Sequence, residues 1–189
     1  MIVLALAAVF AFSGCVNLGG TAQPKTTTDE RSKQIDNQEF TLRIPREWDV
    51  IEAKDITSDV PSETVLVVRN NVKNEDFTAN VNIVRKNLQT TKDTLEYAKE
   101  VINRQQSGLI NYKEGKRDLV KVTIGGKQFD TYLVHFESKK DEASQLVEFV
   151  QTSAVKGNQA YIITGSYSTK ENGSNVSTVE EIVKSFALK

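Results

Sequence analysis

Apolar and polar residues alternate with a period of two in several short segments after residue 38, a pattern that predicts β-strands. Residues 40–44 alternate in this way, and Pro45 ends the strand because proline has no N–H to donate to a neighbouring strand. Residues 65–68 are continuously apolar, which is typical of a strand buried on both faces. Residues 79–83 alternate again. The first half of the chain therefore predicts three strands.

Two segments have the apolar spacing of amphipathic helices. In the first, we expect Thr91 to be the N-cap and the helix to end near residues 106–108. The second covers residues 176–186, where Ser177 and Glu180 have the spacing of a capping box. Each helix should bury one apolar face against the rest of the fold.

The segment between these helices has the pattern of a β-meander. Residues 120–124 alternate, and Gly125 and Gly126 suit a two-residue hairpin loop because both tolerate positive φ. Strands follow over 129–136, 146–155 and 160–167. Because strands joined by hairpins pair antiparallel and amphipathic helices must cover a sheet, we predict an α+β fold. Its expected architecture is α/β/α, a central antiparallel β-sheet sandwiched by helices.

The chain begins with an apolar run over residues 2–12. It is too short to span a membrane, which takes about 20 residues, and suits the core of a signal peptide. Ser13, Gly14 and Cys15 follow, and this resembles the bacterial lipobox. The match departs at Phe12, where leucine is usual, and a basic region before the apolar run is missing. We expect a signal peptide over 1–14 and lipid on Cys15. A secretory signal with an incidental cysteine is the alternative.

Residues 15–37 are rich in Gly, Thr, Gln and charged residues and have no apolar period. Such a composition buries too little apolar surface to offset the entropy of ordering. We therefore expect a lipidated flexible tether over 15–37 and a folded domain over 38–189.

The segment from Phe40 to Trp48, FTLRIPREW, resembles the opening of the PsbP-like superfamily, where a strand is followed by a proline and a tryptophan. The closing helix, with VEEIVKSF over 179–186, resembles the end of the same family, and the element order agrees. The family includes photosystem extrinsic subunits, a Ran-binding nuclear import factor and many lipoproteins. The resemblance implies a central antiparallel sheet with helices on both sides. It carries no binding residues to this chain, because fold does not fix function.

The charges balance almost completely, with 24 Lys and Arg, 25 Asp and Glu and a formal net charge of -1. We therefore expect no nucleic-acid partner, since such partners favour strongly basic surfaces. One cysteine excludes an internal disulfide.

The chemistry-bearing residues do not assemble into a catalytic pattern. His135 is the sole histidine; it opposes Val134 and Phe136 in strand period, so we interpret it as a structural or surface residue. The oxygen-rich loop over 70–76 lacks the spacing of a calcium loop, so we interpret it as a polar turn. We expect Trp48 in the core, and we expect neither a metal nor a cofactor.

Asn172 and Asn175 each begin a glycosylation acceptor pattern, and whether either is used is left open. The leading hypothesis is a membrane-anchored extracytoplasmic lipoprotein whose domain is a non-catalytic binding or accessory module. It would contact the membrane through lipid on Cys15 and a protein or other envelope partner through its domain. The alternatives are an envelope enzyme built on Ser, Asp and Glu, and a purely structural envelope protein.

Overall fold

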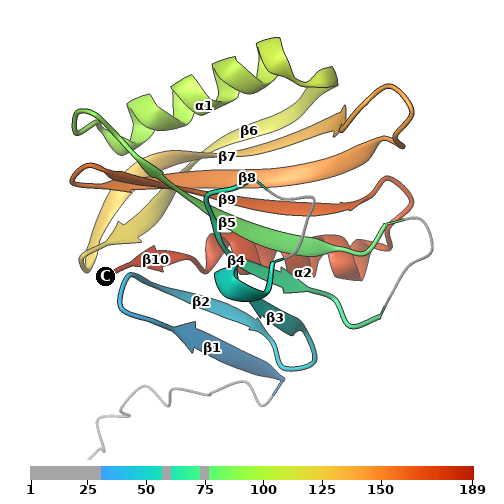
Figure 1. Cartoon of the computed structure of the whole chain (residues 1–189), viewed down its shortest axis with the longest axis horizontal. Helices are drawn as coiled ribbons and strands as arrows, with labels where there is room; N and C mark the ends of the chain where they lie inside the picture. Colours follow the sequence, from blue (N-terminus) through green and yellow to red (C-terminus); the bar gives the residue numbers. More distant parts are fainter. Residues whose placement is uncertain (1–30, 57–60, 73–76) are drawn as a thin grey trace, which may run out of the picture.

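The computed structural model describes residues 31–56, 61–72 and 77–189 (Figure 1). Ten strands form one sheet: β1 Ser32–Asp36, β2 Phe40–Pro45, β3 Asp49–Glu52, β4 Thr64–Arg69, β5 Asn80–Asn87, β6 Ile110–Ile124, β7 Lys127–Lys139, β8 Val147–Lys156, β9 Gln159–Ser168 and β10 Ala187–Leu188. The helices are η1 Ala53–Asp55, a single 3₁₀ turn, α1 Thr94–Gly108 and α2 Gly173–Lys184.

The predicted strands and helices are all present, but both helix starts differ from expectation. Asp93, and not Thr91, caps α1, because its carboxylate accepts hydrogen bonds from the N–H groups of Leu95 and Glu96. Helix α2 begins earlier than predicted, at Gly173, with Asn172 as its N-cap. Ser177 therefore lies inside the helix, where its hydroxyl donates to the carbonyl of Gly173, and the predicted capping box is wrong.

Strands β1, β3 and β10 were not predicted, and β6 was predicted only in part. Strand β6 starts at Ile110, ten residues before the alternation that predicted it, because its first half is largely solvent-exposed and carries charges in place of apolar residues. Residues 32–36 form β1 although they were assigned to the tether, so the expected domain start at Gln38 is too late. The segment has one apolar residue, Ile35, which packs against the core. The remaining positions of the expected signal peptide and tether, through residue 30, lie outside the described residues.

The sheet is curled by one short connection. Its strand order is β1-β2-β10-β6-β7-β8-β9-β5-β4-β3, so β2 and β3 lie near opposite ends. Only residues 46–48 join these strands in the chain. The two ends of the sheet must therefore approach each other, and the sheet forms a half-barrel (Figure 1). Lys33 stabilises this connection, because its Nζ donates hydrogen bonds to the carbonyls of Arg46 and Trp48 at 2.8 and 2.9 Å.

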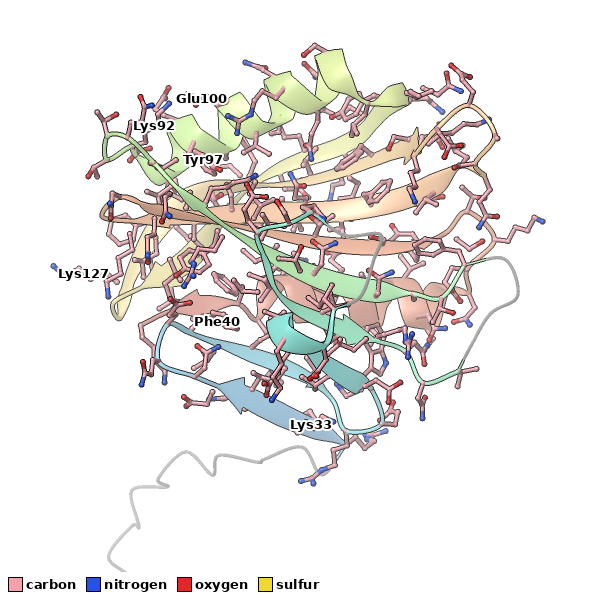
Figure 2. The ribbon with its side chains drawn as sticks, in the orientation of Figure 1. Lys33, Phe40, Lys92, Tyr97, Glu100 and Lys127 are labelled. Carbon is pink, nitrogen blue, oxygen red and sulfur yellow. The ribbon has the colours of Figure 1, made fainter. Side chains whose placement is uncertain are left out.

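The two helices pack on opposite faces of the sheet. Ile102 of α1 packs against Val134 on β7, whereas the adjacent Leu133 belongs to the core beneath α2. Successive strand residues point to opposite faces, so α1 and α2 lie on different sides. Helix α2 contacts β2 as well as β5, β8 and β9, which places it inside the curl. Phe40 of β2 (Figure 2) and Tyr161 of β9 meet there. Their ring centroids lie 6.4 Å apart.

These contacts correct the predicted α/β/α sandwich. The fold is α+β, as expected, but the sheet dominates it and α1 covers only part of the outer face. The sheet is antiparallel except for one pair, since β10 runs parallel to β6. Trp48 is 3% exposed and belongs to the core, as predicted. Gly125 and Gly126 have φ of 56° and 76°, which confirms the predicted hairpin loop.

Candidate functional site: a groove beside helix α1

A groove of about 900 Å³ lies on the face of the sheet that carries α1. Helix α1 packs mainly over β6, β7 and β8, and its Tyr97 and Val101 also lie in one cluster with Ala160 and Ile162 of β9. Gln105 and Leu109, at the end of α1, form one wall of the groove. Ile51 of β3 and Ile56 after η1 form the opposite wall. Strands and a helix that are fixed by the core therefore shape the groove.

Two rows of cross-strand neighbours form the floor. The first runs Gln151, Thr164, Asn82 and Val67 across β8, β9, β5 and β4. The second runs Phe136, Phe149, Ser166, Asn80 and Arg69 across β7, β8, β9, β5 and β4. Directly paired residues point to one face, so each row presents its side chains together. The floor is apolar and aromatic at the α1 side and polar toward β5.

An amide network fixes the polar part of the floor to α1. Gln105 donates from Nε2 to Oε1 of Gln151 at 2.8 Å, and Gln151 donates back to Oε1 of Gln105 at 3.1 Å. The hydroxyl of Thr164 donates to the same Gln151 oxygen at 2.9 Å. Gln151 is only 3% exposed. A buried amide that is satisfied in this way orders its neighbours, so these groups are held in fixed orientations.

Phe136 and Phe149 on the groove floor belong to a stack of three aromatic rings, the third of which is Tyr112. The ring centroids of Tyr112 and Phe136 lie 5.2 Å apart, and those of Phe136 and Phe149 lie 4.9 Å apart. Burial and the nearby negative charge of Glu114 raise the pKa of Tyr112 to about 12, so its hydroxyl remains protonated at neutral pH. Such a stack offers an apolar surface to a ligand.

Cationic side chains lie along the rim. Arg69 contacts Asp49 through an N–O distance of 3.4 Å, while its buried Nε has no hydrogen-bond partner among the described residues. Lys86 is 2.5 Å from a carboxylate oxygen of Glu63. Hydrogen bonds from Lys86 and Ser62 lower the pKa of Glu63 to about 2. The groove thus joins an aromatic surface, fixed amides and a charged rim.

A second hollow of about 630 Å³ continues the groove along α1. Lys86, Gln105, Leu109 and Ile162 line both. Tyr97 of α1 also lines this hollow (Figure 2). The guanidinium of Arg104 lies 5.8 Å from its ring. Together the two hollows provide an extended binding surface, which the sequence did not predict because its residues come from eight separate elements.

The sequence-predicted residues lie elsewhere. His135 is on the face opposite Val134 and Phe136, as expected, but it faces α2 and is partly buried. Its Nε2 lies 3.7 Å from Oε2 of Glu180. In the loop over 70–76, the described Asn70 accepts a hydrogen bond from the N–H of Val72, as in a polar turn. Residues 73–76 and Cys15 lie outside the described residues.

Within the described ranges, no group of three or more His, Cys, Asp or Glu side chains is arranged to hold a metal ion. None of the helices in these ranges combines the length and the apolar character needed to cross a membrane. Asn172 and Asn175 both lie at the start of α2, where the side chain of Asn172 caps the helix by accepting from the N–H of Asn175.

A family model described as DcrB matches residues 55–185. The chain belongs to the DcrB family. The matched segment contains both α-helices of this DcrB family member and all of the groove except its wall at Ile51. Strands β1, β2 and β3 precede the matched segment. No curated protein matches the chain by sequence.

Solved structures confirm the PsbP-like fold that the sequence resembled. Cyanobacterial PsbP (CyanoP) from Synechocystis sp. PCC 6803 is similar with a TM-score of 0.56 and 9% identity, over 90% of this chain and 100% of that one. LpqN from Mycobacterium tuberculosis, described as involved in cell envelope biogenesis, has a TM-score of 0.58 and 11% identity, over 84% of this chain and 90% of that one. At these identities the likeness concerns the fold of the DcrB family member.

Proposed function

We propose that this DcrB family member is a lipid-anchored, extracytoplasmic binding protein of the cell envelope, and that the groove beside α1 is its ligand site. The observation that carries the proposal is the groove itself, about 900 Å³ in volume with fixed amides beside stacked aromatic rings. A ligand that presents both an apolar surface and hydrogen-bonding groups would match it. The role is binding rather than catalysis, and neither a metal nor nucleic acid takes part.

The envelope location rests on two supports. The first is the sequence around Cys15, which resembles a lipobox after an apolar signal. The second is LpqN, which shares the fold and is described as involved in cell envelope biogenesis. Lipid on Cys15 would hold the protein at the membrane, because two acyl chains give stable anchoring where one gives marginal binding.

The anchor is tested by fractionating cells that make the wild type or Cys15→Ala. We expect the wild type to sediment with membranes after a high-salt wash and the variant to be released. A variant that still sediments would mean that another contact holds the protein there. A wild type that is already soluble would refute lipidation.

The groove is tested with a photo-crosslinking residue, p-benzoylphenylalanine, at Asn82 on the groove floor. The matched control carries it at Ser174, which is exposed at the start of α2 on the other side of the sheet. After irradiation of cells, we expect a discrete adduct from position 82 alone, identified by mass spectrometry. Identical adducts from both positions, or none from position 82, would contradict a ligand site in the groove.

A further inference from the structure

A separate pocket of about 200 Å³ lies on the opposite face of the sheet, at the end of α2. Its inner walls are apolar and come from β6, β7, the end of α2 and the residue before β10: Val120, Val122, Leu133, Val183 and Phe186. This pocket shares no lining residue with the groove beside α1. It is therefore a distinct feature of the molecule, independent of the proposed function.

Thr152 of β8 is the one inner lining residue with a hydroxyl, and its Oγ1 is buried without a hydrogen-bond partner among the described residues. Thr152 is 6% exposed. A valine would fill the same space without leaving a buried polar group unsatisfied, which is costly. A buried water needs two to four polar partners, and the five apolar side chains of the inner walls offer it none. The hydroxyl therefore points to a ligand group that enters the pocket with a polar atom.

The pocket adjoins an uncovered edge of the sheet. Among the described residues, β6 pairs on its outer side with β10 alone, at Thr123 and Ile124. Figure 1 shows β10 as a short strand beside the end of β6. The N–H of Gly125 donates outward to the carbonyl of Leu188 at 2.9 Å. Because this orientation repeats every second residue, Lys121 and Leu119 direct their N–H and C=O groups to the same open side.

The edge beside the pocket is regular, in contrast to the rest of β6. Register shifts interrupt the pairing of β6 with β7 between Ile110 and Lys116, and such bulges protect an edge from pairing. From Arg117 to Ile124 the register is uninterrupted. This regular part also carries Leu119, which is 60% exposed on the face opposite the pocket. A strand added here would contact Leu119 on one face and the pocket on the other.

We propose that this edge binds an extended peptide segment of a partner protein, which adds as a strand to β6 and inserts one side chain into the pocket. Main-chain hydrogen bonds to Leu119 and Lys121 give affinity, and the pocket gives specificity, as in other strand-addition complexes. The inserted side chain is an aromatic ring with a polar tip, such as tyrosine, because the walls are apolar and Thr152 offers one hydroxyl.

The test uses the purified full-length protein and acetylated seven-residue peptides of alternating Thr and Lys, with Tyr, Phe or Ser at the centre. Two variants separate the contribution of the pocket hydroxyl from that of the main-chain hydrogen bonds. Thr152→Val removes the hydroxyl and keeps the volume. Lys121→Pro removes the outward N–H but no hydrogen bond to β7, and proline is tolerated at such an edge position. Lys121→Ala is its matched control, since it loses the same charge and keeps the N–H. Circular dichroism and thermal unfolding establish that each variant is folded.

We expect the Tyr peptide to bind and the Ser peptide not to, with amide exchange of Leu119 and Lys121 slowed in NMR spectra. Thr152→Val should weaken the Tyr peptide about five- to tenfold and leave the Phe peptide unchanged, since one hydrogen bond is lost. Lys121→Pro should abolish binding, while Lys121→Ala, which keeps the outward N–H, should still bind the Tyr peptide.

Several results would overturn the proposal. One is that no peptide binds at millimolar concentration. Another is that p-cresol, the side-chain analogue of tyrosine, binds the pocket while no peptide protects the edge, which would indicate a small-molecule site. A third is that ultracentrifugation shows self-association with the same amides protected in the absence of peptide, which would make a second copy the occupant.

Discussion

Gly165 determines how closely α2 approaches the sheet. A β-carbon at this position would lie 2.2 Å from Cγ1 of Val179, 2.9 Å from Cγ1 of Val150 and 3.2 Å from Cγ2 of Val183. Carbon atoms pack at about 3.5–4.0 Å, so Gly165→Ala would force α2 away by about 1 Å. Val179 has little freedom to turn aside, because valine in a helix has one strongly preferred rotamer.

We therefore expect Gly165→Ala to reduce the free energy of unfolding by about 3 kcal/mol, the upper end for overpacking of a core. This is a large share of the roughly 5–15 kcal/mol that stabilises a domain. Val179 is fully buried, so Val179→Ala alone should cost about 2 kcal/mol through lost burial and a cavity. Equilibrium unfolding in urea measures both values.

The double variant tests the contact between positions 165 and 179 more directly than either single variant does. Removing the γ-methyl groups of Val179 makes room for the new β-carbon, so Gly165→Ala with Val179→Ala should cost about 2–3 kcal/mol rather than the additive sum of about 5. Additive effects would show that the two residues do not meet. A cost below about 1 kcal/mol for Gly165→Ala would refute the close packing of α2 on β9.

Three further predictions concern the core, the first helix and the buried tyrosines. Trp48→Ala should cost about 3–5 kcal/mol in denaturant unfolding, since it empties a large buried site; a loss below about 1 kcal/mol would place the indole at the surface. Asp93→Ala should cost about 1 kcal/mol and the neighbouring Thr91→Ala almost nothing, because only Asp93 caps α1; equal losses would contradict the cap. Burial and the negative charge of Glu148 raise the pKa of Tyr167 to about 12, so the folded protein holds this proton more tightly than the unfolded chain, where tyrosine titrates near 10. Its stabilising effect is complete below pH 10 and is lost as the pH rises to about 12, so Tyr167→Phe should flatten the fall in unfolding free energy over that range, and an unchanged slope would count against the shift.

The sequence predicted the elements of this fold better than their arrangement. Alternation located the strands around Phe40 and Val81, because one face of each is buried. It missed β1 and the first half of β6, which bury few side chains and so leave no period. The curl of the sheet follows from the three residues between β2 and β3, but that is evident only once the strand order is known.

The residues of the candidate site could not be predicted from the sequence for a related reason. Gln105 and Gln151 hydrogen-bond across 46 positions in the chain, and nothing local in either segment marks them as partners. The close packing at Gly165 could have been predicted, because an isolated glycine inside a strand often marks the close approach of another element. His135 is the sole histidine, yet it lies beside Glu180 on the face of the sheet opposite the groove.

The position of β10 has a consequence for the order of folding. In the described structure, the β1–β2 hairpin joins the sheet through Ala187 and Leu188, which pair with Thr41 and Phe40 on one side and with β6 on the other. The β1–β2 hairpin therefore has no pairing partner in the rest of the described sheet until Ala187 and Leu188 are in place. Such long-range closure is slow, because its entropic cost is met before the contacts form. We infer that the central meander assembles first and that the first hairpin docks last.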